Sequence, residues 1–368
     1  MSTQKNNPAH DFVKVTPRRA RTLALAYLQA GLVPFIKSSP GEGKSSIVSS
    51  IFEEMKWHMR DHRMSTSLPE DQNGLPNFVG SGESARATFV PFDIFPLERD
   101  PVPRGYNGHG LFLDEFNSAD RQTQATCYKI VLDRKVGQFN LHPETAIVLA
   151  GNLDTDNAIV NDLSTAMQSR LAHIHMVTSL PEWLQDVAYP RDFAEEVISY
   201  VNFAGTVSDF DPNHNEATFM CPRTLEFLSN TLKSMKGNQK PYDPDTDADI
   251  AAGVIGVSNA LKFNAFMKVY AFIPNYADIV SNPMHAIIPD KKDGMWATMG
   301  HIGKKFKMED LRNVLQYISR YPTEMQIMLM RMLRGQYPEI NYEQPFVEMT
   351  VKLVRHLNGR SMFEDGNL

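Results

Sequence analysis

The chain carries the glycine-rich stretch Ser38-Ser39-Pro40-Gly41-Glu42-Gly43-Lys44-Ser45 between an apolar run, 32–36, and a segment, 46–55, that reads as a helix. In a strand, loop and helix of this kind, backbone N–H groups and the helix N-terminus bind the phosphates of a nucleoside triphosphate. Lys44 would reach the β- and γ-phosphates, and the Ser45 hydroxyl would bind Mg²⁺. Ser38 departs from the pattern, because the loop usually opens with a glycine. We expect ATP and Mg²⁺ to be bound by Ser39, Pro40, Gly41, Glu42, Gly43, Lys44, Ser45 and Ser46.

Composition places the chain among ordinary globular proteins. It has 368 residues, of which 42% are hydrophobic and 22% charged, which is enough for two domains with substantial cores. No apolar run approaches the ~20 residues that span a bilayer, and the polar start lacks the apolar core of a signal peptide, so a cytoplasmic location is expected. The net charge of −6 gives no general attraction to nucleic acid. Cys127 and Cys221 lie far apart and suggest neither a disulfide framework nor a zinc site.

Apolar runs alternate with helix-like segments over the first half of the chain. Buried-strand patterns occur at 110–115, 146–150 and 173–177, and a helix is expected over 121–132. Strands that alternate with helices predict a parallel sheet. After about residue 180 the pattern is mostly helical. The predicted fold is α/β, with a flexible tail at 1–14, a nucleotide-binding core at 15–205 and a helical region at 206–368.

Two segments inside the core have a different character. Residues 64–104 are rich in Pro, Gly and Ser and contain one strand-like run at 87–90. Residues 135–144 are expected to form a hairpin with Gly137 near its bend. Neither segment carries a chemical motif of its own.

Two acidic residues follow the apolar run 110–113. Hydrolysis of ATP needs an acid that holds Mg²⁺ and a base that orients or deprotonates the attacking water. Asp114 would bind the metal, and Glu115 would be the base. An acidic pair at the end of a strand can also be a solvated turn. Its position downstream of a phosphate loop favours the catalytic interpretation.

Three further polar side chains have suitable positions. Asn152 follows the next buried strand and would place the water against the γ-phosphate, although Gly-Asn is also a common turn. Arg170 precedes the last strand, and Arg223 follows Pro222 at the start of a helix. Either cation could stabilise charge on the γ-phosphoryl oxygens. A lone arginine at a helix end is usually a surface residue, so each assignment depends on the whole pattern.

The order of these motifs closely resembles the MoxR-like branch of the AAA+ ATPases. The resemblance covers roughly Thr16 to Lys233. It includes residues 61–76, which are similar to that branch's segment after the second helix, and residues 124–137, which are similar to the helix and hairpin before sensor 1. The resemblance implies a P-loop AAA+ core, a parallel sheet flanked by helices, followed by an all-helical lid domain.

The resemblance also assigns roles by matching position. Gly41, Gly43, Lys44 and Ser45 correspond to Walker A, Asp114 and Glu115 to Walker B, and Asn152 to sensor 1. Arg170 would be the arginine finger, acting on ATP held by a neighbouring subunit, and Arg223 would be sensor 2, reaching from the lid in the same subunit. The family typically forms hexameric rings, in which the segment at 63–76 and the hairpin at 135–144 would face the pore or one ring surface.

The resemblance implies a chaperone-like ATPase that remodels or activates a protein complex, commonly with a partner bearing a von Willebrand factor A domain. Two alternatives stay open. One is a DNA- or RNA-directed motor or loader, which the acidic net charge disfavours. The other is a switch that binds ATP and hydrolyses it poorly, which the changed residue Ser38 would allow.

Overall fold

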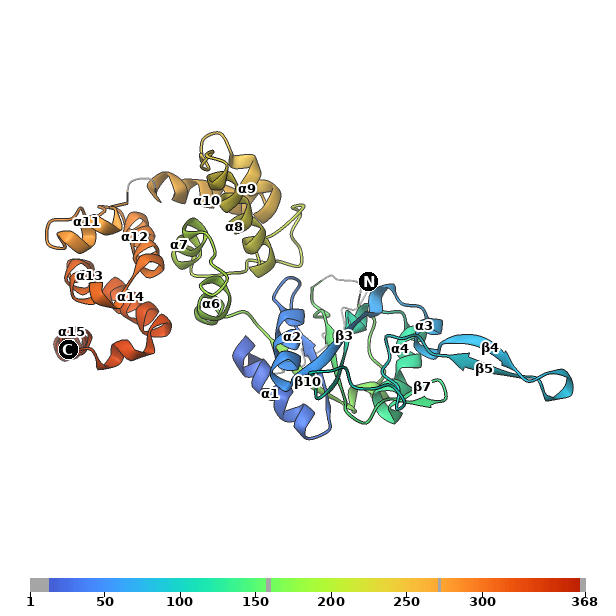
Figure 1. Ribbon diagram of the computed structural model, residues 1–368. Helices are drawn as coiled ribbons and strands as arrows, with labels where there is room; N and C mark the ends of the chain where they lie inside the picture. Colours follow the sequence, from blue (N-terminus) through green and yellow to red (C-terminus); the bar gives the residue numbers. More distant parts are fainter. Residues whose placement is uncertain (1–12, 157–159, 271–272, 365–368) are drawn as a thin grey trace, which may run out of the picture. The chain divides into compact units, whose positions relative to one another are not determined.

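The structure is a computed structural model that describes residues 13–156, 160–270 and 273–364 (Figure 1). The chain divides into two compact units. The first contains the residues up to Thr178 together with Phe210–His214, and the second contains Ser179–Asp209 and the residues from Asn215 onward. Of the expected tail at 1–14, residues 1–12 lie outside the described residues, whereas Lys14–Val15 forms a strand, β1.

The first unit is built on a six-stranded sheet in the order β1-β10-β2-β9-β6-β3, in which every pairing is parallel. The strands β6 and β9 are buried along their whole length, as the apolar runs in the sequence require of a parallel sheet covered on both faces. Besides β1, the strands of this sheet are β2 (Val33–Lys37), β3 (Trp57–Arg63), β6 (Gly108–Asp114), β9 (Thr145–Gly151) and β10 (Leu171–Met176).

Alternate residues of these strands enter two separate apolar cores. Ile36, Phe112 and Val148 share one core with residues of α1 (Pro17–Gln29) and α2 (Lys44–Met55). Their neighbours Phe35, Leu113 and Leu149 share the other core with residues of α4 (Arg121–Tyr128) and of the π-helical turn Lys129–Asp133. The period of two along each strand therefore produces a layered structure of helices, sheet and helices.

The register of the sheet aligns the carboxyl ends of its central strands. Lys37 is paired with Gly151, Leu113 with Leu149, and Arg63 with Asp114. The segments that leave β2, β6 and β9 consequently emerge at one edge of the sheet. This is the place where open α/β sheets bind ligands.

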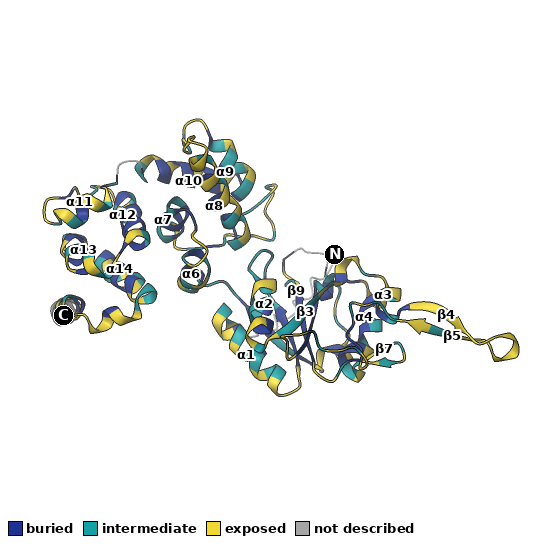
Figure 2. Ribbon diagram, in the orientation of Figure 1, coloured by how far each residue is buried: buried dark blue, intermediate teal, exposed yellow. Residues whose placement is uncertain are grey.

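Two antiparallel hairpins extend this unit. The strands β4 (Leu75–Val79) and β5 (Arg86–Val90) form an arm that projects from the sheet and is exposed along most of its length (Figures 1 and 2). The sequence analysis anticipated a strand only at 87–90. The second hairpin, β7 (Lys135–Val136) and β8 (Phe139–Asn140), has the expected bend, with Gly137 at a φ of +57°.

The second unit is helical in its described part and has two apolar cores. One core contains residues of α6 to α10, and the other contains residues of α11 to α15. The helices are α6 (Leu180–Trp183), α7 (Glu195–Ala204), α8 (Pro222–Gly237), α9 (Ala248–Ile255), α10 (Val257–Tyr270), α11 (Tyr276–Ser281), α12 (Lys292–Lys305), α13 (Leu311–Ile318), α14 (Thr323–Gln336) and α15 (Gln344–Glu364). No helix in the described ranges combines the length and the hydropathy that a membrane span requires.

The units divide earlier than the sequence boundary at residue 205. The helix α7 ends at Ala204, and its residues Val197, Ile198 and Val201 are fully buried in the core that also holds Leu225 of α8 and Phe263 of α10. Its apolar side chains therefore belong with the helices that follow it. The first unit ends where β10 passes into α6.

Candidate functional site

The glycine-rich loop connects β2 directly to α2. Gly41 and Gly43 have φ values of +76° and +91°, in the left-handed region that glycine enters at little cost. A Cβ at Gly43 would meet nothing within 4 Å, so its backbone conformation, rather than lack of space, requires the glycine. The helix α2 begins at Lys44, so the unpaired N–H groups of its first turn border the loop. Loop and helix together supply donors for an anion.

The Lys44 side chain is anchored to the loop and to the end of β9. Its Nζ donates hydrogen bonds to the carbonyl oxygens of Ser38 at 2.8 Å and Ser39 at 3.2 Å, and to Oδ1 of Asn152 at 3.1 Å. Lys44 and Asn152 are 108 residues apart in the sequence, and both were expected to act on the γ-phosphate. The structure brings them together.

Ser38 is compatible with the loop. It is fully buried, and its Oγ lies 3.3 Å from Nζ of Lys44 and donates to the Ser39 carbonyl at 3.2 Å. It is absent from the described non-glycine residues with positive φ, so the serine adopts its conformation without left-handed strain. The hydroxyl that replaces the usual opening glycine becomes a partner of Lys44.

Ser45 and Asp114, the two expected metal ligands, are hydrogen-bonded to each other. The Ser45 hydroxyl donates to Oδ2 of Asp114 at 3.1 Å, and Oδ1 of Asp114 accepts the N–H of Glu115 at 2.8 Å. A hydroxyl and a buried carboxylate are oxygen ligands of the type that Mg²⁺ binds beside substrate phosphates and water. The two side chains therefore fit a magnesium ion.

Glu115 has an unusual backbone and a hydroxyl partner. Its φ is +54°, a value uncommon outside glycine, and the Ser65 hydroxyl donates to its carboxylate. Ser65 lies in the single turn Met64–Thr66 that follows β3. In the sequence, Ser65 belongs to the stretch 61–76 that resembles the family, and no pattern there predicts a role for it at the site.

Asn117 fixes the backbone at Asn152, a relationship that the sequence analysis missed. Its Nδ2 donates to the Asn152 carbonyl at 2.8 Å, and its Oδ1 accepts the Asn152 N–H at 3.1 Å. A Cβ on Gly151 would lie 2.2 Å from that Oδ1. Gly151 thus lets the buried Asn117 amide lie close to the backbone before Asn152. The glycine before Asn152 was the only feature of the sequence that could have indicated this contact.

Two carboxyl groups lie beside the phosphate loop. Burial raises the pKa of Glu42 to about 7, Lys44 opposes that shift, and Asp156 adds to it. Burial also raises the pKa of Asp156, whose Oδ1 accepts the Ser39 hydroxyl at 3.4 Å. Glu42 was expected only as a loop residue, and Asp156 was not anticipated. Burial therefore favours the neutral form of both carboxyl groups close to where phosphates would bind.

The two arginines lie in other segments of the chain. Arg170 is exposed and donates to the Ala166 carbonyl at 2.8 Å, just after α5 (Thr165–Gln168). Arg223 is exposed in the first turn of α8, in the second unit. Their proposed roles depend on a neighbouring subunit and on the lid.

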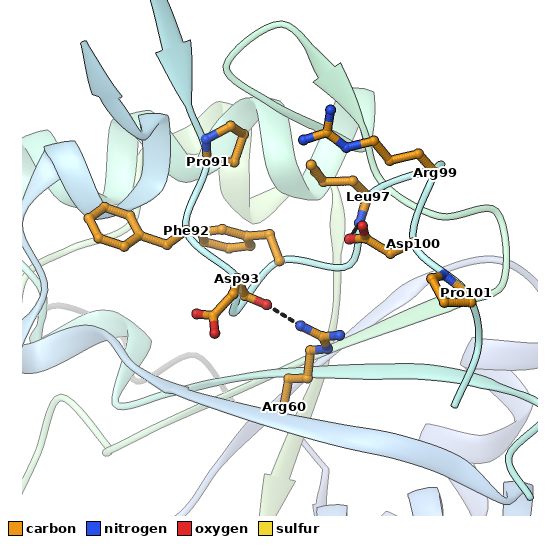
Figure 3. A pocket seen from close by; sticks show the side chains of 9 residues that line it. Arg60, Pro91, Phe92, Asp93, Leu97, Arg99, Asp100 and Pro101 are labelled. Atoms are coloured by element: carbon orange, nitrogen blue, oxygen red, sulfur yellow. Dashed lines mark hydrogen bonds between the residues drawn. The ribbon is translucent and has the colours of Figure 1, made fainter. Parts of the chain in front are cut away.

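A pocket of about 510 Å³ lies elsewhere on the first unit (Figure 3). Arg60 of β3 donates to the Asp93 carbonyl within it, and Asp100 accepts the Leu97 N–H at 2.7 Å. Its lining contains none of the site residues expected from the sequence. The polar groups of this pocket mainly stabilise the segment between β5 and β6.

Comparison with known proteins gives a likeness in fold. No family model matches the chain, and no curated protein matches it. Among solved structures, the RuvB Holliday junction branch migration motor of Thermotoga maritima is similar over 69% of this chain and 74% of its own, with 15% identity and a TM-score of 0.38. A putative ATPase from Cytophaga hutchinsonii is similar over 93% of this chain and 90% of its own, with 10% identity and a TM-score of 0.34. The structure itself shows a parallel sheet with helices on both faces, followed by a helical region.

NtrX from Brucella abortus is similar over 70% of this chain and 61% of its own, with 13% identity and a TM-score of 0.37. The predicted fold class is confirmed by the parallel sheet and the helices that follow it. The roles of the site residues depend on their geometry in this chain.

Proposed function

We propose that the protein is an Mg²⁺-dependent ATPase of the MoxR-like AAA+ kind. The observation that carries the proposal is the pairing of Lys44 with Asn152 and of Ser45 with Asp114 at one edge of the sheet. These pairs join the phosphate loop to the ends of β9 and β6. If Asp114 and Asn152 only belonged to solvated turns, their side chains would bind water instead of Ser45 and Lys44 of the loop.

Each residue has a chemical part in hydrolysis. Backbone N–H groups of the loop bind the phosphates, and Lys44 leaves its present acceptors to neutralise the β- and γ-phosphates. Ser45 and Asp114 would hold Mg²⁺, and the metal would supply positive charge to the phosphate oxygens. Glu115 accepts the proton of the attacking water, and Asn152 orients that water. Arg170 of a neighbouring subunit and Arg223 of the same chain stabilise the charge that develops during transfer.

The exposed arm supports a protein substrate over a nucleic acid. Phe78 is 77% exposed and Val79 is 57% exposed, and both lie near the tip of the arm. Among residues 75–90 the only basic residue is Arg86, while Glu83 adds a negative charge. A surface that binds nucleic acid needs clustered Lys and Arg to contact phosphates. We propose that a ring of these subunits remodels a protein complex, with a von Willebrand factor A domain protein as one candidate partner.

ATP turnover by purified variants tests the chemistry. We expect Lys44→Ala to lose ATP binding, and Glu115→Gln to bind ATP while its turnover falls on the order of a hundredfold or more. Glu70→Gln changes an exposed acid in α3 (Pro69–Asn73) and serves as the matched control with unchanged turnover. Wild-type turnover in Glu115→Gln would contradict the proposal.

Mixing variants tests the ring and the arginine finger. Lys44→Ala and Arg170→Ala are each expected to be inactive alone. In a mixed ring, an intact loop of one subunit meets an intact arginine of the next, so activity should partly return. A mixture as inactive as its components would contradict an arginine supplied by a neighbour. Stimulation of turnover by DNA, lost at higher salt, would instead favour the nucleic-acid motor.

A further inference from the structure

The helix α15 carries an apolar stripe that its own unit does not cover. Phe346, Met349 and Leu353 are buried in the core formed with α13 and α14. Val347, Val351 and Val354 are exposed by 41%, 42% and 49%. The helix therefore has a second apolar face beside the one that attaches it to the unit.

The exposed valines share one face because they are spaced by four and then three residues. Single exposed apolar residues are normal on protein surfaces. Three exposed valines in one row are less expected than single ones, because valine has a lower helix propensity than alanine or leucine. Exposure of its apolar side chain to water also does not stabilise the helix. A four-three spacing of apolar residues is the pattern through which two helices pack along a seam.

Charged residues beside the stripe identify a second copy of this chain as the occupant. Glu348 and Arg355 are exposed and are seven residues apart, so they lie on the same edge of the stripe. If two copies pair antiparallel about an axis at Val351, the same edges of the two helices face each other. Glu348 of each copy then faces Arg355 of the other copy, which gives two equivalent charge pairs. A parallel pair in register would place each Glu348 level with its own counterpart.

We propose that α15 pairs antiparallel with α15 of a second copy through Val347, Val351 and Val354, with the two Glu348–Arg355 pairs setting direction and register. This contact is isologous, whereas a ring contact is head-to-tail, so it joins two rings or two subunits outside a ring. It is independent of the nucleotide site. The valine row spans about 10 Å, so a single contact is weak and gains strength where an oligomer presents several copies of α15.

Cysteine cross-linking of the full-length chain tests the axis. We expect Val351→Cys to give a disulfide-linked dimer under mild oxidation, because residue 351 meets its own counterpart. The native thiols of Cys127 and Cys221 are buried, and burial raises the pKa of Cys127. We therefore expect little cross-linking through the native cysteines. Lys352→Cys is the matched control, since Lys352 is the next residue, is also exposed and is turned away from the stripe by the 100° step of the helix. No dimer, or equal cross-linking of both variants, would overturn the proposal.

Charge reversal tests the direction. In the Val351→Cys background, Glu348→Arg and Arg355→Glu should each lower the cross-linking yield about tenfold, because each replaces two attractive pairs with two repulsive ones. The double reversal restores opposite charges and should recover the yield. Loss in both single variants without recovery in the double variant overturns the antiparallel arrangement. Lys44→Ala should cross-link like the parent, so failure of the ATPase proposal would leave this result unchanged.

Discussion

The hydroxyl of Ser45, in the first turn of α2, donates a hydrogen bond of 3.1 Å to Oδ2 of Asp114 at the end of β6. These residues are 69 positions apart, and the parallel sheet brings them together because β6 and α2 meet at the same edge. Both groups are oxygen ligands, and the proton of the Ser45 hydroxyl points to the carboxylate. If both groups hold Mg²⁺, the metal would take the place of this hydrogen bond.

We therefore expect Ser45→Ala to raise the Mg²⁺ concentration needed for half-maximal ATP turnover by about tenfold, which corresponds to the loss of one ligand. A titration of turnover against Mg²⁺ at saturating ATP measures the shift. Ser49→Ala removes the hydroxyl of a serine one turn along α2, which bonds to Glu53, and should leave the titration unchanged. An unshifted curve for Ser45→Ala would exclude Ser45 as a ligand.

The hydrogen bond from Ser65 to the Glu115 carboxylate leads to a second prediction. Ser65 acts through the proposed base, which it touches, so we regard it as a positioning residue. Ser65→Ala should lower kcat roughly tenfold with little change in KM, because the carboxylate loses a partner worth about 1.5 kcal/mol. Ser65→Thr keeps the hydroxyl and should retain most of the activity. A drop in both variants alike would indicate damage to the turn rather than loss of the hydrogen bond.

The sequence predicted β2, β6, β9 and β10 of the central sheet, and β6 and β9 appear most clearly, because they are buried on both faces and form continuous apolar runs. It did not predict β1 or β3, neither of which contains a buried residue. Of the β4–β5 arm it predicted only β5, since every residue of β4 is exposed and no burial pattern marks that strand. The same distinction applies to the site. Lys44 and Asp114 belong to recognisable local motifs, whereas Asn117, Ser65 and Asp156 act through partners 35 to 117 residues away. Only the folded sheet brings such residues together.

The close contact between Asn117 and Gly151 can be tested by adding a Cβ at residue 151. Gly151→Ala puts a Cβ 2.2 Å from Oδ1 of Asn117 and 2.9 Å from the Phe35 ring, so the amide must leave the backbone of Asn152. We expect the free energy of unfolding to fall by about 2 kcal/mol or more, and ATP turnover to fall with it. Chemical denaturation measures the first effect, and a turnover assay measures the second.

Gly253→Ala provides the matched control for this change. Gly253 lies in α9, and a Cβ there meets nothing within 4 Å. An alanine in an open helix position should leave stability unchanged or raise it by up to about 1 kcal/mol. If Gly151→Ala behaved like Gly253→Ala, the amide of Asn117 would have to be free to move, and its clamp on Asn152 would not be needed.

The raised pKa of Glu42 predicts a pH-dependent stability. Its folded value of about 7 lies above the reference value of 4.5, so the folded chain binds the proton more tightly than the unfolded chain. The contribution of this group to stability is therefore complete below pH 4.5 and decreases as the pH rises, and it levels off above pH 7 after a loss of about 3 kcal/mol. Glu42→Gln has no proton to lose and should escape this loss.

Chemical denaturation without nucleotide, at pH 5 and at pH 8, measures the effect. We expect Glu42→Gln to be more stable than the parent chain at pH 8, and the difference to become small at pH 5. Glu53→Gln, which changes an exposed acid on α2, should show no such difference between the two pH values.

Phosphates near Glu42 would favour its neutral form further, because like charges raise the pKa of a carboxyl group. ATP should therefore bind more tightly at pH 6 than at pH 8 in the parent chain, and this pH dependence should weaken in Glu42→Gln. Equal pH dependence in both proteins would mean that Glu42 turns away from the loop when the nucleotide binds.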